Sequence, residues 1–147
     1  MQYSHGSNTV MRVIGVLDAL TAQVQAWDFS KATADRIGRC WLRAATQYPL
    51  ARNIYFVIDN WPVHFNPRVL DQLAKDPRIQ LLPLPTYSPW LNNIEKLWRW
   101  VKQHVSHAHP WCDDFNVFKT YVRTELARCS GLPELHRYCG LHRLFSQ

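Results

Sequence analysis

The chain has 147 residues, of which 47% are apolar and 19% are charged, and its formal net charge is +6 at pH 7. A chain of this length fits one domain, expected here over residues 1–147, and the apolar content excludes a disordered polypeptide. The positive charge favours nucleic acid as a partner, and no apolar stretch reaches the roughly 20 residues of a membrane-spanning helix.

The first half of the chain predicts a β-hairpin, a helix and a buried strand. Residues 10–17 form an apolar run with β-branched side chains, and residues 23–29 alternate polar and apolar side chains, as paired strands do. Apolar residues recur at helical spacing over residues 33–48. Residues 54–58 are all apolar, which predicts a strand that is covered on both faces and ends at Asp59.

The second half of the chain predicts three helices and one strand. Asn66 followed by Pro67 is a good helix start, because it places an N-cap before a proline at the first helical position. We expect helices over residues 66–75, 92–105 and 115–126, and a strand over residues 79–84. This order of elements predicts an α/β fold with a mixed sheet and flanking helices.

Two acidic residues occupy positions suited to chemistry. Asp59 follows a buried strand, where ligands of open α/β sheets gather, although an aspartate there also commonly begins a turn. Glu95 lies in the first turn of a predicted helix, where a capping role together with Asn92 is the ordinary explanation. A phosphate-binding site would also explain the three cations that follow on that helix, Lys96, Arg99 and Lys102.

The segments around the two acids resemble a known family. Residues 57–60 read VIDN, His64 follows, and residues 84–98 read LPTYSPWLNNIEKLW. These segments are similar to the last two catalytic blocks of mariner-like and insertion-sequence DDE transposases. Thirty-five residues separate Asp59 from Glu95, a spacing that resembles the family's, and a composite pattern this long is far more specific than a short motif.

The resemblance implies a ribonuclease H-like fold and metal-dependent cleavage and transfer of DNA strands. Asp59 and Glu95 would be two of three carboxylates that bind a pair of Mg²⁺ (or Mn²⁺) ions. Asn60 and His64 would orient Asp59 or touch the phosphate, although solvated polar surface explains them equally well. The complete protein would be a homo-oligomer on element ends and target DNA, with DNA contacts from Lys96, Arg99, Lys102, Trp61 and Trp90.

One part of the family pattern is missing. The first catalytic aspartate of the family lies on a strand ahead of the hairpin, and none of the residues before Val10 is acidic. Asp18 falls in the hairpin turn and Asp28 at the far end of the second strand, so both are poor substitutes. We therefore expect a partial domain without its first central strand, from a truncated, split or frameshifted reading frame, with the missing N-terminal part as a partner.

A zinc site is the main alternative for the histidines and cysteines. His104, His107, His109 and Cys112 lie close in sequence, with further candidates downstream, but their spacing matches no usual zinc pattern. The four cysteines form no C-x-x-C pair and no signal-peptide pattern is present, which predicts a reduced, cytoplasmic location. Among the tryptophans, Trp41 and Trp98 fall on apolar helix stripes and are expected in the core.

The function of the chain by itself stays open between two classes. As an enzyme fragment it would cleave DNA only when its missing N-terminal part is supplied. As a remnant it would bind DNA or oligomerise without catalysis, and a ribonuclease H-like nuclease is a third interpretation. The first two interpretations predict DNA binding that weakens steeply with salt concentration.

Overall fold

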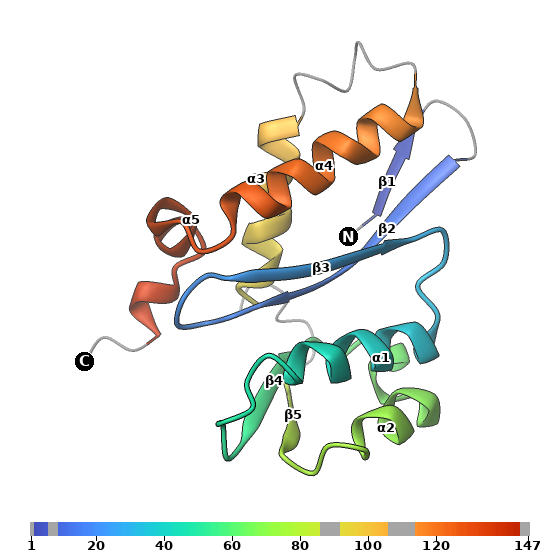
Figure 1. The fold of residues 1–147 in the computed structure, drawn as a ribbon, viewed down its shortest axis with the longest axis vertical. Coiled ribbons are helices and arrows are strands. Elements are labelled where there is room, and N and C mark those ends of the chain that lie inside the picture. Colours follow the sequence, from blue (N-terminus) through green and yellow to red (C-terminus); the bar gives the residue numbers. More distant parts are fainter. Residues whose placement is uncertain (1, 6–8, 86–91, 106–113, 145–147) are drawn as a thin grey trace. The chain divides into compact units, whose positions relative to one another are not determined.

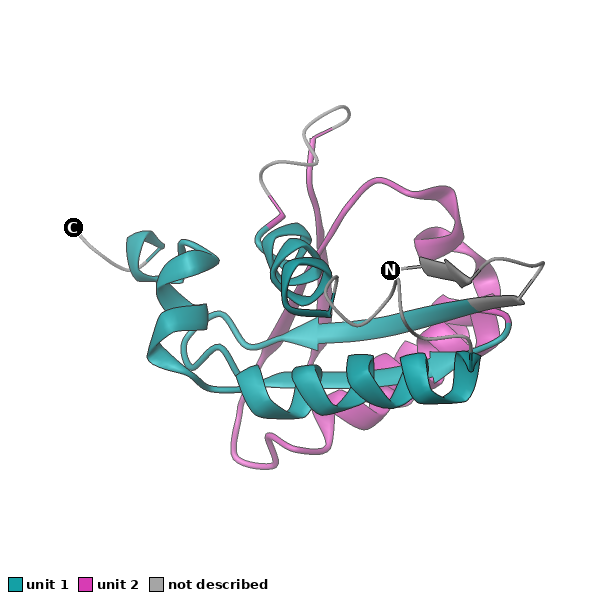
Figure 2. Cartoon of the chain, turned by 90° about the horizontal axis from the view of Figure 1, so that it is seen from above, with its two compact units in different colours: residues 1–30, 93–147 teal, residues 31–92 magenta. Residues whose placement is uncertain are grey.

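The computed structural model describes residues 2–5, 9–85, 92–105 and 114–144 (Figure 1). Contacts within the chain divide it into two compact units (Figure 2). Unit 1 contains Met1–Ser30 and Asn93–Gln147, and unit 2 contains Lys31–Asn92. Among the described residues, no helix combines the length and the apolar character that crossing a membrane requires.

Unit 1 contains an antiparallel sheet of three strands in the order β1–β2–β3. β2 (Thr9–Leu17) and β3 (Val24–Phe29) form the predicted hairpin. β1 (Gln2–His5) was not predicted. It is a short strand ahead of the hairpin, where no strand was expected from the sequence, and it pairs with the first residues of β2, His5 opposite Thr9. Four residues without apolar alternation carry no strand signal of their own, so only the pairing with β2 defines β1.

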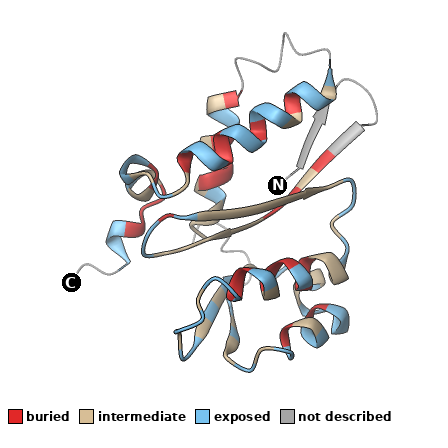
Figure 3. Ribbon diagram, in the orientation of Figure 1, coloured by how far each residue is buried: buried red, intermediate tan, exposed pale blue. Residues whose placement is uncertain are grey.

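The described residues of unit 1 also contain four helical segments. They are α3 (Ile94–Val105), α4 (Phe115–Cys129), α5 (Pro133–Tyr138) and the short 3-10 helix η4 (Leu141–Arg143). Buried residues recur along α4 with exposed ones between them (Figure 3), and Phe118 of α4 shares one core with Met11 of β2 and Leu97 of α3. The sequence predicted α3 and α4 but missed α5 and η4, which are too short for a clear period.

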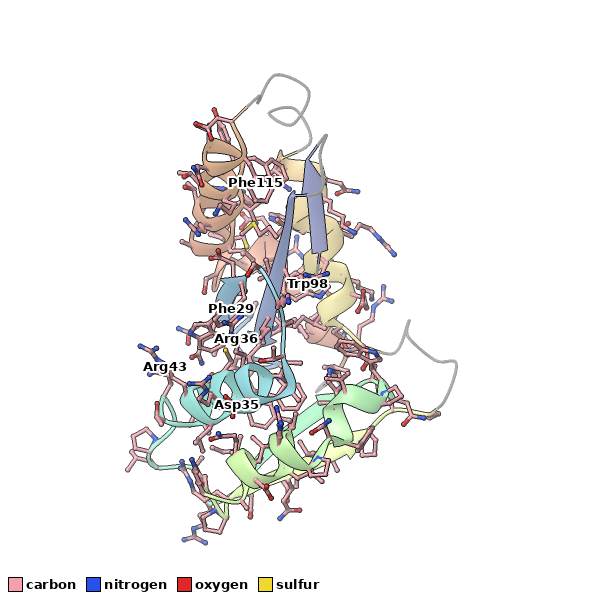
Figure 4. The ribbon with its side chains drawn as sticks, turned by 90° about the vertical axis from the view of Figure 1, so that its right-hand side faces the viewer. Phe29, Asp35, Arg36, Arg43, Trp98 and Phe115 are labelled. Carbon is pink, nitrogen blue, oxygen red and sulfur yellow. The ribbon has the colours of Figure 1, made fainter. Side chains whose placement is uncertain are left out.

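One glycine sets the packing of α3 on β2. A Cβ atom at Gly15 would lie 2.2 Å from Cη2 of Trp98, a distance at which two carbon atoms clash. Trp98, labelled in Figure 4, is buried, which confirms its predicted place in the core. Glycine at this position therefore lets an indole ring lie directly against the strand backbone.

Unit 2 is built on two parallel strands, β4 (Ile54–Ile58) and β5 (Ile79–Pro83). Its helices are α1 (Ala34–Ala45), η1 (Pro62–Phe65, a 3-10 helix) and α2 (Pro67–Leu73). α2 starts as predicted, because the Asn66 side chain accepts a hydrogen bond from the Arg68 N–H at 2.9 Å. Trp41 of α1 is buried and stacks on Phe56 of β4 with ring centroids 5.7 Å apart, which confirms its predicted core position.

Two expectations about the sheet differ from the structure. The described strands form an antiparallel sheet and a separate parallel pair, so both strand directions are present but no described strand joins them into one sheet. The prediction that β4 is covered on both faces is wrong, since Tyr55 is 55% and Val57 is 53% exposed. Apolar character shows that a side chain tolerates burial, but a second layer is needed to bury it.

Candidate active site

The end of β4 places Asp59 at the edge of unit 2. Ile58, the last residue of the strand, is buried, and its carbonyl oxygen accepts a hydrogen bond from the Leu84 N–H at 2.8 Å. Backbone hydrogen bonding therefore fixes β4 as far as its last residue. Asp59 follows directly, with a side chain that is 39% exposed. A rigid strand end thus presents a partly solvated carboxylate.

The next turn of the chain folds His64 back onto Asp59. η1 begins after Trp61, and the His64 N–H donates to the Trp61 carbonyl oxygen at 2.9 Å. This tight turn places Nδ1 of His64 2.9 Å from Oδ1 of Asp59 and 3.3 Å from the Asp59 carbonyl oxygen. A carboxylate oxygen accepts hydrogen bonds, so this contact is a hydrogen bond in the imidazole tautomer that carries hydrogen on Nδ1.

Two indole rings hold the imidazole of His64 in place. The ring centroid of Trp41 lies 5.0 Å from that of His64, and the centroid of Trp61 lies 5.3 Å away in an edge-on arrangement. The His64 side chain is only 14% exposed, whereas Trp61 is 49% exposed. The histidine is therefore fixed from the core side by Trp41 and from the solvent side by Trp61.

The hydrogen bonds to Asp59 converge on one of its two oxygens. Oδ1 receives the contact from His64 and a longer hydrogen bond, 3.3 Å, from the Trp61 N–H. No described residue donates to Oδ2. Oδ1 is thus the oxygen that the turn engages, and the side chain as a whole remains partly exposed to solvent.

Glu95 lies on α3, in unit 1, and its side chain is exposed. α3 starts at Ile94, two residues later than predicted, so Glu95 is the second helical residue. In a capping box the acid is the third helical residue, so Glu95 does not occupy that position in this helix. The favourable interaction of a carboxylate with the start of a helix remains an ordinary reason for an acid there.

The three cations that follow Glu95 differ in their surroundings. Arg99 and Lys102 are exposed, whereas Lys96 is half-buried. A Cβ atom at Gly140, which follows α5, would lie 3.0 Å from Nζ of Lys96, and Gly140 has a φ of +73° that favours glycine. Lys96 therefore packs inside unit 1 against the end of α5, and Arg99 and Lys102 are the cations that α3 presents to solvent.

Two predicted site residues remain, and the structure describes one of them. Asn60 is exposed and follows Asp59 in unit 2, beside Trp61 and His64. Trp90 lies outside the described residues. The structure thus brings Asp59, Trp61 and His64 into contact within unit 2.

The other acids near the hairpin are engaged elsewhere. Oδ1 of Asp18 accepts hydrogen bonds from the N–H groups of Leu20 and Thr21 at 2.8 and 3.2 Å, which is the pattern of a turn aspartate. Asp28 is held by the Arg123 guanidinium at 2.9 and 2.7 Å, and this hydrogen bonding keeps the pKa of Asp28 below its ordinary value. Both side chains stabilise the fold of unit 1.

A buried carboxylate on α4 is also satisfied within unit 1. Burial raises the pKa of Glu125, but hydrogen bonds from Arg128 and from the indole N–H of Trp100 outweigh that effect, so the pKa is lowered overall. The distances are 2.6 and 2.8 Å to Arg128 and 2.9 Å to Trp100. The sequence did not single out this cluster, because its members come from two helices and only packing brings them together.

The zinc alternative receives no support from the described residues. No group of three or more His, Cys, Asp or Glu side chains among them could hold a metal ion, and His107, His109 and Cys112 lie outside them. Cys129 and Cys139 are buried, and burial raises the pKa of each thiol to about 11. A cysteine binds zinc as a thiolate, and burial disfavours that form at these two positions in the metal-free protein.

Comparisons with known proteins place most of the chain in one family of sequences. The family model described as DDE superfamily endonuclease matches residues 2–116. The chain is 24% identical over 128 residues to the "Insertion element IS630 uncharacterized 39 kDa protein" of Shigella sonnei. This alignment covers 87% of the chain. The chain spans 37% of the length of that relative.

A solved structure has a similar fold. The catalytic core domain of BIV integrase matches with a TM-score of 0.57 at 18% sequence identity. The match covers 84% of this chain and 76% of that chain. This likeness confirms the predicted ribonuclease H-like α/β fold.

Proposed function

Because this chain belongs to the DDE superfamily of endonucleases, we propose that it supplies Asp59 and Glu95 to the active site of a DNA transposase. The superfamily match runs from residue 2 to residue 116 and includes both acids. Asp59 carries this proposal, because it stands at a strand end, partly exposed to solvent, with Oδ1 held by His64. The insertion-element relative supports a transposase over other endonucleases of the superfamily.

Endonucleases of this superfamily use divalent metal ions, and Mg²⁺ or Mn²⁺ is the proposed cofactor. The residues fit such a cation, since Asp59 and Glu95 offer carboxylate oxygens and are both accessible to solvent. A bound pair of these ions would stabilise the charge that develops on the attacking and leaving oxygens of phosphoryl transfer.

The proposed reaction is phosphoryl transfer in two stages. In cleavage, the oxygen of water bonds to phosphorus while the bond from phosphorus to the 3′ oxygen breaks, which leaves a 3′-hydroxyl and a 5′-phosphate. In strand transfer, that 3′-hydroxyl oxygen bonds to a phosphorus of target DNA while the target's own bond to its 3′ oxygen breaks. Each stage forms one phosphorus–oxygen bond and breaks one, so no oxidant or reductant is needed.

The surrounding residues would position the acid and the DNA. His64 holds Asp59 in a single orientation through Nδ1, with Asn60 beside it at the same strand end. Arg99 and Lys102, exposed on α3, are suited to phosphate groups of the DNA backbone, with Lys96 contributing charge from a half-buried position. The exposed ring of Trp61 offers a surface on which DNA can pack, and Trp90 is proposed for the same role.

The third carboxylate is proposed to come from outside these 147 residues. Asp18 and Asp28, the acids of the hairpin, are held by the turn and by Arg123. β4 pairs with β5 along one edge, and no described strand pairs along its other edge, beside Asp59. We propose that the chain is one partial domain, that a strand ending in aspartate completes it, and that the complete transposase acts as an oligomer on element ends and target DNA.

The test is DNA nicking by a completed protein. The DNA upstream of the Met1 codon is translated in all three frames, and a segment with a strand ending in aspartate is fused ahead of Met1. Nicking of a labelled duplex is then measured with Mg²⁺, with Mn²⁺ and with EDTA. We expect nicking that needs a metal and is lost in Asp59→Ala and in Glu95→Ala.

Matched controls remove exposed acids away from the site. Asp71→Ala on α2 and Glu134→Ala on α5 should nick at the wild-type rate. Nicking that survives Asp59→Ala would overturn the proposed role of that acid. Salt-sensitive DNA binding without any nicking would instead favour a catalytically inactive remnant, and cleavage of RNA in an RNA–DNA hybrid would favour a ribonuclease H-like nuclease.

A further inference from the structure

Unit 2 carries a row of arginines that the proposed chemistry does not use. Arg36, Arg39 and Arg43 lie on α1 at spacings of three and four residues, so they follow one another along one side of the helix. We call these three residues the α1 arginine row. The opposite side of α1 packs into unit 2 through buried residues that include Trp41 and Ala44.

The three side chains of the row are engaged to different extents. Arg36 donates from Nη1 to the Lys31 carbonyl oxygen at 2.8 Å, which anchors it near the start of the helix. Arg39 pairs with Asp35 at 2.6 Å, yet its side chain is 61% exposed. Arg43 is exposed, extends away from α1 (Figure 4), and forms no ion pair with any described residue.

An ordinary solvated helix face does not account for this arrangement. Like charges four residues apart, as at Arg39 and Arg43, destabilise a helix, and solvated faces normally alternate in sign. Asp35 is the single acid of α1, and its other side-chain contact is a hydrogen bond from Gln72 at 2.9 Å. Unit 2 has eight Lys and Arg against four Asp and Glu, so it holds four of the chain's six net positive charges.

We propose that the α1 arginine row binds the phosphate backbone of double-stranded DNA and is the DNA-contact surface of unit 2. This proposal rests on the proposed function, and it adds a surface distinct from α3 of unit 1. The planar guanidinium group matches the geometry of phosphate oxygens better than a lysine ammonium does. From Arg36 to Arg43 the helix rises about 10 Å, which corresponds to about three nucleotide steps of one DNA strand. The contact is independent of base sequence, because phosphates carry none.

The test measures binding of the whole chain to a short duplex of unrelated sequence. Fluorescence anisotropy gives the affinity at NaCl concentrations from about 50 to 200 mM, the range in which phosphate contacts are most apparent. EDTA is present throughout, so cleavage does not interfere. We expect the double variant Arg39→Gln/Arg43→Gln to weaken DNA binding by on the order of tenfold or more. The slope of log affinity against log salt concentration should fall in magnitude by about 2.

Three further variants test whether DNA binding depends on the α1 arginine row itself or only on the net charge of the protein. Arg52→Gln/Lys75→Gln removes the same charge from exposed positions of unit 2 outside α1 and should change the slope little. Arg39→Lys/Arg43→Lys keeps the charge and should keep most of the slope. Asp35→Asn removes the acid that competes for Arg39 and should tighten binding.

Equal losses in the two glutamine double variants, or unchanged binding in Arg39→Gln/Arg43→Gln, would overturn the proposal. Asp59 and Glu95 are intact in every variant, and binding is measured without metal. A failure here therefore leaves the nicking result untouched. Conversely, the completed protein could bind DNA through the α1 arginine row without nicking it. That result would contradict the proposed nuclease activity and support the proposed role of the row.

Discussion

Nδ1 of His64 lies 2.9 Å from Oδ1 of Asp59, and the two residues are five positions apart in the chain. The contact depends on η1, which turns the chain directly after the strand, and on the ring of Trp41, which supports the imidazole from the core side. It ties Oδ1 of Asp59 to the turn, while the side chain as a whole remains partly exposed to solvent. The chemistry proposed for Asp59 therefore depends on a neighbour that need not touch DNA itself.

His64→Ala should lower metal-dependent nicking by about 10- to 100-fold, the usual effect of removing a residue that orients a metal ligand. The apparent Mn²⁺ concentration for half-maximal nicking should rise as well, because a freely rotating Asp59 binds a cation less well. The completed protein described above is used, with His142→Ala, an exposed histidine of η4, as the control. Unchanged metal dependence together with a lower melting temperature would mean that His64 only stabilises the fold.

Asp28→Asn should destabilise the protein at pH 7 by on the order of 1 kcal/mol, as expected for a partly exposed ion pair. The Arg123 hydrogen bonds hold the pKa of Asp28 below its ordinary value, so the carboxylate contributes stability above the ordinary pKa and loses it as pH falls through the lowered pKa. Urea unfolding at pH 7 and near pH 3 measures the difference. It should shrink at the lower pH, and Arg123→Gln should behave in the same way. A difference that is constant with pH would contradict this account.

Gly15→Ala should destabilise unit 1 by about 1–3 kcal/mol, the usual cost of overpacking. The added methyl group would meet the Trp98 ring at 2.2 and 2.9 Å, and a strand backbone has little freedom to withdraw. Thermal or urea unfolding measures the loss. Trp98→Phe in the same chain removes the larger ring, so the double variant should lose less than the sum of the two single variants. Strict additivity would show that the two residues do not collide.

Asn66→Ala should cost about 1 kcal/mol, because the first turn of α2 loses the side chain that accepts from the Arg68 N–H. Asn66→Ser and Asn66→Asp keep a capping oxygen and should stay close to wild type. Unfolding in urea, followed by far-ultraviolet circular dichroism, compares the four proteins. Equal stability of the alanine and serine variants would remove the capping explanation for the start of α2.

Local patterns predicted most elements of this fold because they act over a few residues. The cap at Asn66 and the proline after it place the start of α2, and the apolar period of α4 is clear without any neighbour. The elements that were missed, among them β1, α5 and η4, are short, and each is defined by what it packs or pairs with. The prediction for β4 failed for the same reason, since its sequence is apolar on a face that no described layer covers.

The sequence by itself singled out Asp59 and Glu95 as the candidate acids, because they stand in a composite pattern far more specific than a short motif. Only the tertiary structure decided what each polar group touches. Asp28 and Arg123 are 95 residues apart in the chain yet form a two-hydrogen-bond pair, and His64 reaches Asp59 only because η1 turns the chain back. Side-chain contacts of this kind depend on where packing brings distant segments, and a local pattern of residues carries no information about that.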